Sequence, residues 1–199
     1  MKVFLIISIS LVVLFIIFQT QMAMATDKTN QQTYNVLLVE KDFEIRFYPS
    51  ATLATITSSA KSYKELANPG FRKLANYIFG GNNAKQKISM TSPVHMDIND
   101  SASSMSFVMP KNYNKDNLPI PNNPEVVIKT TSDEYVAVIK FSGFASDKMI
   151  KLYAEKLEKA LKEKSISFYG HFRFLGYNPP FQLFGRRNEI IVSVIWISK

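Results

Sequence analysis

The residues of this sequence with the most obvious chemistry are two histidines and one arginine–glutamate group. The histidines are His95 and His171, and cysteine is absent. A chain without cysteine has no disulfide, thiolate metal site or cysteine nucleophile, and two histidines nearly exclude a multi-histidine metal site. The charged group is Arg186, Arg187 and Glu189. No phosphate loop, zinc-binding helix or nucleophile elbow accompanies them.

Glu189 begins an otherwise apolar strand predicted over 189–197. Strand alternation places it on one face with Ile191 and Ser193. A buried carboxylate without a partner is costly, so two interpretations stay open. Glu189 either points into a cleft, where it meets a cationic ligand or acts as a general base, or it pairs with a neighbouring arginine and fixes the last hairpin.

The first 25 residues form a targeting segment. An apolar run over 3–18 follows Lys2 and precedes Ala23-Met24-Ala25, which fits the A-x-A cleavage pattern. We expect either a signal peptide cut after Ala25 or an N-terminal membrane anchor, because the run is long for a signal core and short for a full span. In both cases the domain is exported to a periplasmic or other extracytoplasmic location, either soluble or anchored to the cytoplasmic membrane.

Residues 26–33 would then be a polar linker. Loss of residues 1–25 removes one charge, that of Lys2, and lowers the formal net charge from +8 to +7. The basic residues are scattered, and those of 148–164 alternate with glutamates as on a solvated helix face. Because no basic and aromatic residues interleave along a stripe, a nucleic-acid partner is not expected.

The order of the predicted elements comes from periodicity and turn signals. Strands are expected at 43–48, 51–58, 87–98, 105–109, 126–131, 135–141, 171–175 and 189–197. Ser62, followed by glutamate three residues on, matches a capping box. Pro69 is expected to split this region into a short turn and a main helix over 69–79, since proline does not fit a helix interior. Ser146 caps a second helix that runs to about residue 163.

Each half of the chain therefore has the order strand, strand, helix, strand, strand, with a period of about 80 residues. Hairpins dominate, which excludes a doubly wound sheet, and each helix must bury its apolar stripe on the sheet. We expect an α+β fold in which two pseudo-symmetric halves form a partly closed barrel. The cleft where the halves meet would be the default ligand site.

Several segments, taken in order and spacing, resemble the SOUL family of haem-binding proteins. They are FEIRFYP (43–49), GFRKL (70–74), YIFGGN (77–82), KISMTSPV (87–94), SFVMP (106–110), YNPP (177–180) and RNE (187–189). The resemblance identifies residues 34–199 as a SOUL-like domain. It implies a pseudo-two-fold repeat of two βαββ-type halves that form a distorted antiparallel β-barrel flanked by two helices. It also implies non-covalent binding of haem, with haem b as the expected cofactor, or of a related tetrapyrrole.

The resemblance does not supply an iron ligand. In some members a histidine, proposed as an axial ligand, follows the Ile–Arg pair of the first strand, and this chain has Phe47 there. Other members hold haem in an apolar groove beside the first helix without an obligatory histidine. This chain follows the second pattern unless His95 or His171 serves as the axial ligand.

Haem needs apolar cover on its face and cations near its propionates. On the first predicted helix, three apolar residues would give cover and two basic residues would meet the propionates, with Glu189 as a further candidate. The candidate haem-contacting residues are Arg72, Lys73, Leu74, Ile78, Phe79 and Glu189. The alternative for Leu74 and Ile78 is simple packing of the helix on the sheet.

Four functions follow as hypotheses. The first is a tetrapyrrole-binding protein that captures, buffers or transfers haem outside the cytoplasmic membrane. The second is a binding module for another small hydrophobic or cationic ligand, dependent on Glu189. The third is a cleft enzyme with Glu189 as its base, which we favour less than a non-enzymatic role. The fourth is a protein-interaction domain at the membrane, which would expose an apolar patch.

Overall fold

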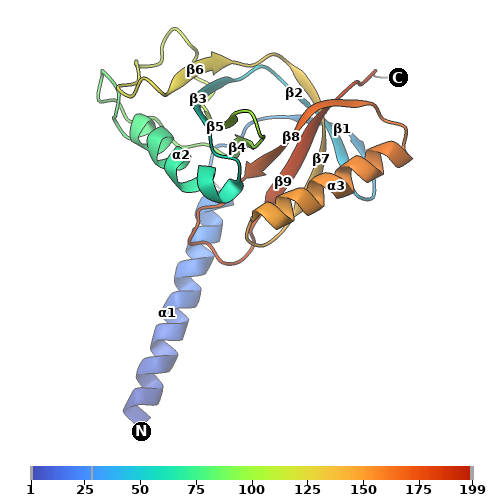
Figure 1. Cartoon of the computed structure of the whole chain (residues 1–199). Helices are drawn as coiled ribbons and strands as arrows, with labels where there is room; N and C mark the ends of the chain where they lie inside the picture. The colour runs from blue at the N-terminus through green and yellow to red at the C-terminus, as the bar shows by residue number, and fades with distance from the viewer. Residues whose placement is uncertain (1, 28, 198–199) are drawn as a thin grey trace.

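A curved antiparallel sheet carries two helices, while a third helix, α1, extends away from it (Figure 1). The computed structural model describes residues 2–27 and 29–197. Four residues lie outside the described ones: Met1 of the predicted targeting segment, Lys28 of the predicted linker, and Ser198 and Lys199 of the predicted domain. The elements are α1 (Lys2–Asp27), β1 (Asn35–Val39), β2 (Glu44–Tyr48), β3 (Thr52–Ser58), α2 (Tyr63–Ile78), β4 (Val94–Asp97), β5 (Ser103–Val108), β6 (Val127–Thr130), β7 (Glu134–Phe141), α3 (Asp147–Glu163), β8 (Phe168–Gly176) and β9 (Asn188–Val194).

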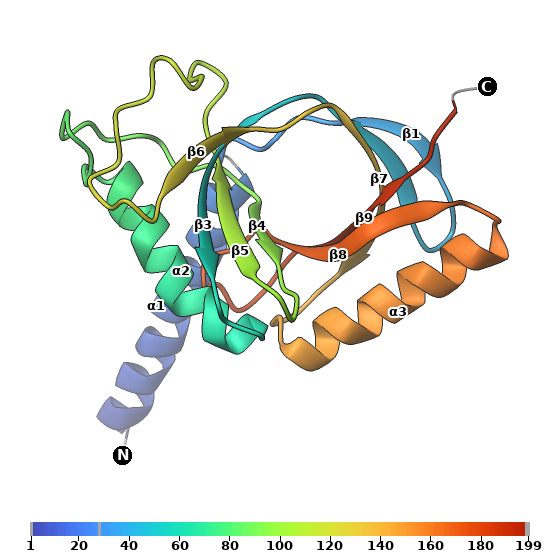
Figure 2. The same cartoon turned by 45° about the horizontal axis from the view of Figure 1, so that its top comes forward.

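The nine described strands form one sheet in the order β1-β2-β7-β9-β8-β4-β5-β3-β6. The sheet curls strongly (Figure 2), but its end strands β1 and β6 do not pair with each other within the described residues, so the predicted barrel is wrong. Two short linkers lie at the open side of the sheet. Residues 49–51 join β2 to β3, and residues 131–133 join β6 to β7. Thr131 N–H donates to Ala51 O at 2.9 Å, so the linkers bond to each other instead of extending a strand ladder.

Two strand predictions differ from the structure. Strand β1 was not expected, because its residues are mostly exposed and show no alternation. The strand predicted over 87–98 is reduced to β4, which starts after Pro93. Proline lacks the N–H that a strand ladder needs, so pairing begins only beyond it. The predicted two-fold repeat of the halves stays a prediction.

Helix α2 begins where the capping pattern predicts. The Ser62 side chain accepts a hydrogen bond from the backbone N–H three residues on, at 3.2 Å. The predicted break at Pro69 is wrong, because α2 is one helix that contains this residue. Pro69 lies on the exposed side, while Leu66 and Leu74 on either side of it are buried. Burial of these side chains outweighs the missing proline hydrogen bond.

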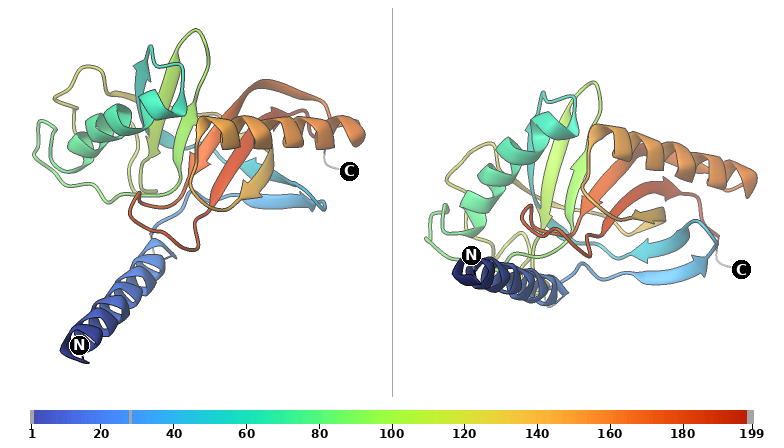
Figure 3. Two further views of the ribbon diagram at one scale, coloured as in Figure 1. Left: turned by 60° about the horizontal axis from the view of Figure 1, so that its bottom comes forward. Right: turned by 90° about the horizontal axis from the view of Figure 1, so that it is seen from below.

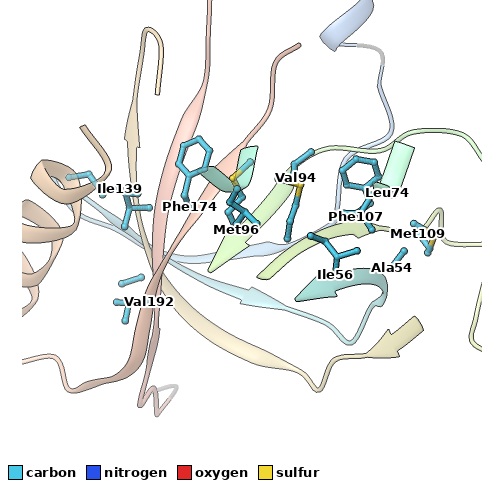
Figure 4. Close-up of a cluster of buried hydrophobic side chains, with 14 of the residues drawn as sticks. Ala54, Ile56, Leu74, Val94, Met96, Phe107, Met109, Ile139, Phe174 and Val192 are labelled. Carbon is cyan, nitrogen blue, oxygen red and sulfur yellow. The ribbon is translucent and has the colours of Figure 1, made fainter. Parts of the chain in front are cut away.

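Helix α3 begins at Ser146, as predicted, and the Ser146 side chain accepts a hydrogen bond from Met149 N–H. Helix α2 packs on β3 and β5, and α3 packs on β7, β8 and β9. One apolar core lies beneath both helices. Figure 4 shows part of it, including Leu74 of α2, Phe107 of β5 and Phe174 of β8.

Strand β9 is buried on both of its faces. Ile190 and Val192 belong to the core under the helices, whereas Ile191 joins a second apolar cluster on the inner face of the curved sheet. Glu189 shares the inner face by alternation and has no exposed surface. The carboxylate of Glu189 on the sheet is therefore inaccessible to water.

Helix α1 stands off from the sheet in both views of Figure 3. Its segment Ile6–Met24 has 19 residues with a mean hydropathy of 2.1, which is long and apolar enough to cross a membrane. A signal sequence near an N-terminus has the same character. The helix continues past the predicted cleavage point at Ala25 to Asp27.

Candidate functional site

A buried ion pair on the inner face of the sheet joins β2 to β9. Arg46 Nη1 donates to Glu189 Oε2 at 3.0 Å, and Arg46 Nη2 donates to Glu189 Oε1 at 3.1 Å. Neither side chain is exposed. Paired, parallel bonds between a guanidinium and a carboxylate are strong and fix the orientation of both groups.

Two residues from the β8–β9 region complete the coordination of Glu189. Arg187 donates to Oε1 from Nε at 3.0 Å and from Nη2 at 2.7 Å. The Tyr177 hydroxyl donates to Oε2 at 2.7 Å. The arginine–glutamate pair, one of the two interpretations open from the sequence, is therefore present. Both carboxylate oxygens accept hydrogen bonds from protein donors.

The network continues toward the surface through Glu44. Arg46 Nε donates to Glu44 Oε2 at 2.8 Å, and Lys140 Nζ lies within ion-pair distance of the other Glu44 oxygen. The ring of Tyr34 lies under the Arg46 guanidinium, 4.1 Å from its centroid. Glu44 thus supplies a second negative charge beside Arg46.

Burial fixes the protonation of this network. It raises the pKa of Tyr48 to about 12, and the negative charge of Glu189 adds to the effect. The same two causes raise the pKa of Tyr177. Burial acts to lower the pKa of Arg46, but the hydrogen bond and charge of Glu189 outweigh it, so that pKa lies above its ordinary value. Tyr48 and Tyr177 therefore stay neutral and Arg46 stays charged near neutral pH, which suits these groups to clamping strands rather than to moving protons.

His95 also turns to the inner face, away from Val94 and Met96, as alternation predicts. Its Nε2 lies 2.7 Å from Gln32 Oε1. Burial, with a smaller effect from the charge of Arg173, lowers the pKa of His95 to about 3. The ring lines a cavity of about 40 Å³. Such a cavity has room for a few water molecules at most.

His171 lies in a different environment, on β8. Its side chain is 61% exposed, and its Nδ1 lies 3.6 Å from Asp97 Oδ1. The two histidines are therefore not brought together, and only His171 presents an accessible ring. No group of three or more histidine, aspartate or glutamate side chains within residues 2–27 and 29–197 is arranged to hold a metal ion.

The candidates on α2 separate into two sets. Leu74 and Ile78 are fully buried against the sheet. Arg72 is exposed, Phe79 is 60% exposed, and Lys73 Nζ pairs with a glutamate, Glu125, at 2.7 Å. Phe79 is the C-cap residue directly after α2, and it follows Arg72 by seven residues, close to two helical turns, on the side away from the buried Leu74.

A larger open groove of about 1040 Å³ lies between the linkers and the connection after β5. It is lined by residues of 30–33, 49–52 and 108–114, together with Thr91 and Thr130. Amides and hydroxyls make up much of this lining, and none of the candidate haem-contacting residues is among it. Apolar side chains, among them Val108, Met109 and Tyr113, also line the groove.

Sequence reasoning missed Arg46, Tyr177 and Tyr34. The alternation of strand 43–48 does place Arg46 opposite the buried Ile45, so an inward arginine was a readable signal. Its partner was not readable, because Arg46 and Glu189 lie 143 residues apart and meet only through the sheet order.

Comparison with known proteins shows what this chain is similar to. Among solved structures, the C-terminal domain of EcmrR is 8% identical with a TM-score of 0.59, covering 82% of this chain and 99% of that one. A hydrolase from Listeria innocua is 7% identical with a TM-score of 0.55, covering 79% of this chain and 94% of that one. At such identities these likenesses concern the fold alone.

Curated relatives are more informative. Heme-binding protein 1 of Xenopus laevis is 30% identical over 162 residues, covering 76% of this chain and 84% of that protein. Heme-binding protein 2 of Mus musculus is 30% identical over 156 residues, covering 74% and 76% respectively. The family model described as SOUL heme-binding protein matches residues 29–193. This protein therefore belongs to the SOUL haem-binding protein family.

Proposed function

We propose that this protein binds haem, as non-covalent haem b, or a related tetrapyrrole outside the cytoplasmic membrane, and captures, buffers or transfers it. The observation that carries the proposal is the family match over residues 29–193. The family description and the relatives' names both refer to haem binding. The match covers both sheet-packed helices and every strand except the last residue of β9, so it concerns the whole domain rather than a local motif.

The exposed face of α2 is the surface that fits haem best among the candidates. Phe79 offers an aromatic ring for the macrocycle, and Arg72 lies on the same face as a cation for a propionate. Lys73 follows Arg72 in the helix. Its exposed ion pair with Glu125 contributes little stability, so replacing Glu125 by a propionate as the partner of Lys73 would cost little. Leu74 and Ile78 hold the helix on the sheet behind this face and position it. Bound haem would supply an iron centre and an intense Soret absorption.

The iron would not be bound by His95. That ring faces a cavity of about 40 Å³ and is bonded to Gln32. A cavity of this size does not accommodate a macrocycle. The accessible histidine is His171, and it is not on α2. We therefore favour binding in a groove without a histidine ligand, with His171 as the alternative.

A ligand site or a catalytic base at Glu189 has less support. Its two oxygens accept hydrogen bonds from Arg46, Arg187 and Tyr177. A cationic ligand would have to displace a guanidinium from a buried pair, which is strongly unfavourable. A general base needs a free lone pair toward its substrate, and the placement of Glu189 offers none.

The N-terminal segment supports an extracytoplasmic location. Helix α1 has the length and composition of a span and follows a lysine at position 2. We infer that it directs export and, where it is not removed, anchors the domain in the membrane.

The sheet order also supports a two-fold repeat, which we propose as the origin of the architecture. Leaving out β1, the order from one end is β2-β7-β9-β8, and from the other end it is β6-β3-β5-β4. In each series the second strand precedes a helix and the third ends its half. The first strand of each half, β2 or β6, lies in the series formed by the other half. Neither half therefore forms a series of four strands alone.

The test is a haemin titration of residues 26–199 with variants on α2. No described residue of α1 belongs to either apolar cluster, so this domain keeps its whole core. Phe79→Ala and Arg72→Gln should each weaken binding, whereas Lys148→Gln, an exposed change on α3, should leave it unchanged. Equal affinities for all three variants would exclude this face of α2.

A further inference from the structure

The connection between β8 and β9 exposes apolar side chains and buries a polar one. We call residues 178–187 the apolar loop. Phe181 is 52% exposed, Leu183 is 42% exposed and Phe184 is 67% exposed, whereas Gln182 is only 2% exposed. A loop that faces water usually has the opposite arrangement. This inversion indicates an apolar environment around the tip of the loop.

Several polar groups of the apolar loop have partners within the protein, although the buried Nε of Arg186 has none among the described residues. Gln182 N–H donates to Pro179 O at 3.2 Å, and Gln182 Nε2 donates to Phe184 O at 2.9 Å. Arg186 Nη1 donates to Pro179 O and to Gln182 O, both at 2.7 Å. Irregular backbone tolerates contact with hydrocarbon only when its polar groups have internal partners. The loop meets this condition at four of its residues.

Helix α1 supplies two more of these bonds. Gln19 Nε2 donates to Phe181 O at 3.3 Å, and Gln19 Oε1 accepts from Leu183 N–H at 3.0 Å. About two turns further on, the Thr26 hydroxyl donates to Gln182 Oε1 at 2.7 Å. Figures 1 and 3 show the loop beside the end of α1 that meets the domain. The apolar loop and α1 are thus one bonded unit.

The position of Gln19 sets the depth of the loop. Gln19 lies inside the apolar segment Ile6–Met24, five residues before its end. At about 1.5 Å per residue, it is about 8 Å deeper than Met24 along the helix axis. When this segment spans the hydrocarbon layer, the backbone bonded to Gln19 lies at or below the membrane surface.

We propose that the apolar loop inserts into the membrane surface and docks the domain on the lipid, with Phe181, Leu183 and Phe184 in contact with the acyl chains. This inference rests on the proposed anchoring by α1. The exposed ring of Phe144, which lies 4.5 Å from the Arg186 guanidinium, widens the apolar surface beside the loop. Docking holds the sheet at a fixed distance from the bilayer instead of on a free tether.

The absence of cysteine makes the test direct, because a single introduced cysteine carries the only label. The full chain is reconstituted in vesicles of equal parts phosphatidylcholine and phosphatidylglycerol, with a nitroxide at Leu183→Cys or Phe184→Cys. Leu14→Cys in α1 reports on the anchor. Ile120→Cys is the matched control, since Ile120 is 68% exposed but lies in the connection between β5 and β6, which Figures 1 and 2 show away from α1.

Collision rates of each label with oxygen, which concentrates in lipid, and with a water-soluble nickel chelate are then compared. The expected result is a higher oxygen rate at positions 14, 183 and 184 and a higher nickel rate at position 120. Lipid exposure at 14 with water exposure at 183 and 184 would overturn loop docking and leave the anchor in place. Water exposure at position 14 would overturn the anchor and the docking together.

A substitution within α1 gives an independent measurement. Gln19→Ala removes the partners of Phe181 O and Leu183 N–H, so the oxygen preference at position 184 should fall. Gln21→Ala changes an exposed glutamine of the same helix and should leave that preference unchanged. Identical oxygen preference in both variants would show that α1 does not hold the loop in the lipid.

Discussion

Arg46 and Glu189 form a two-pronged ion pair between strands that are not neighbours, since β7 lies between β2 and β9 in the sheet. The pair crosses the inner face of the curved sheet with both side chains fully buried. Arg187 and Tyr177 bind the same carboxylate from the β8–β9 side. The carboxylate thereby links two strands, β2 and β9, and the connection after β8, and its role follows from these bonds rather than from contact with a ligand.

Removal of this carboxylate charge should be strongly destabilising. In Glu189→Gln, the buried guanidinium of Arg46 and the partly exposed guanidinium of Arg187 lose their common counter-ion, and we expect the free energy of unfolding to fall by about 3–5 kcal/mol. Urea denaturation of residues 26–199 measures the change. The matched control is Glu158→Gln, which breaks the exposed pair with Lys162 and should cost less than about 1 kcal/mol. Similar losses in the two variants would contradict the clamp.

Buried tyrosines predict a loss of stability in alkali. Burial raises the pKa values of Tyr48 and Tyr77 to about 12 from the ordinary value of 10.0, and it raises that of Tyr177 too. The folded state therefore keeps protons that the unfolded chain releases. The contribution of these groups is complete below about pH 10 and is lost as the pH rises toward 12.

Phenolate absorbance of the native domain, followed against pH, tests this expectation. These three of the nine tyrosines, and Tyr63, whose pKa burial also raises, should ionise only above the ordinary value, together with unfolding. In urea all nine should titrate near the ordinary value. Ionisation of every tyrosine near pH 10 in a domain that remains folded would contradict the burial of these residues.

His95 should contribute to the loss of stability in acid. Burial lowers its pKa to about 3 from the ordinary value of 6.5, so the unfolded chain takes up a proton before the folded state does. The contribution is present above about pH 6.5 and disappears as the pH falls toward 3. In His95→Gln the decrease of stability over this range should be shallower than in the wild type. His171→Gln removes the other histidine for comparison, and equal slopes for wild type and His95→Gln would contradict the assignment.

Local signals in the sequence predicted the helices well. Ser62 and Ser146 act through their own backbone neighbours, so their caps could be inferred without the fold. The break expected at Pro69 was wrong because a local rule met the burial of Leu66 and Leu74, which only the sheet provides. At Pro69, tertiary packing outweighs the low helix propensity of proline.

Other features depended on the curvature of the sheet and could not be predicted from periodicity. Alternation indicated which way His95 and Glu189 point, but not that the inner face closes around them. The partner of Glu189 on β2 required the order in which β7 separates the two strands. Barrel closure was expected from the resemblance, whereas the linkers at 49–51 and 131–133 bond to each other and leave the sheet open.

The most direct test of haem binding is a haemin titration of residues 26–199, followed at the Soret band, for the wild type, His95→Gln and His171→Ala. We predict a saturable one-to-one shift that survives His95→Gln, because that ring lines a cavity of only about 40 Å³. Loss of the shift in His171→Ala would identify that histidine as the iron ligand, and its survival would support a groove without a histidine. A wild-type protein without a saturable shift would contradict haem binding, and a shift abolished in His95→Gln would contradict the account of the inner face.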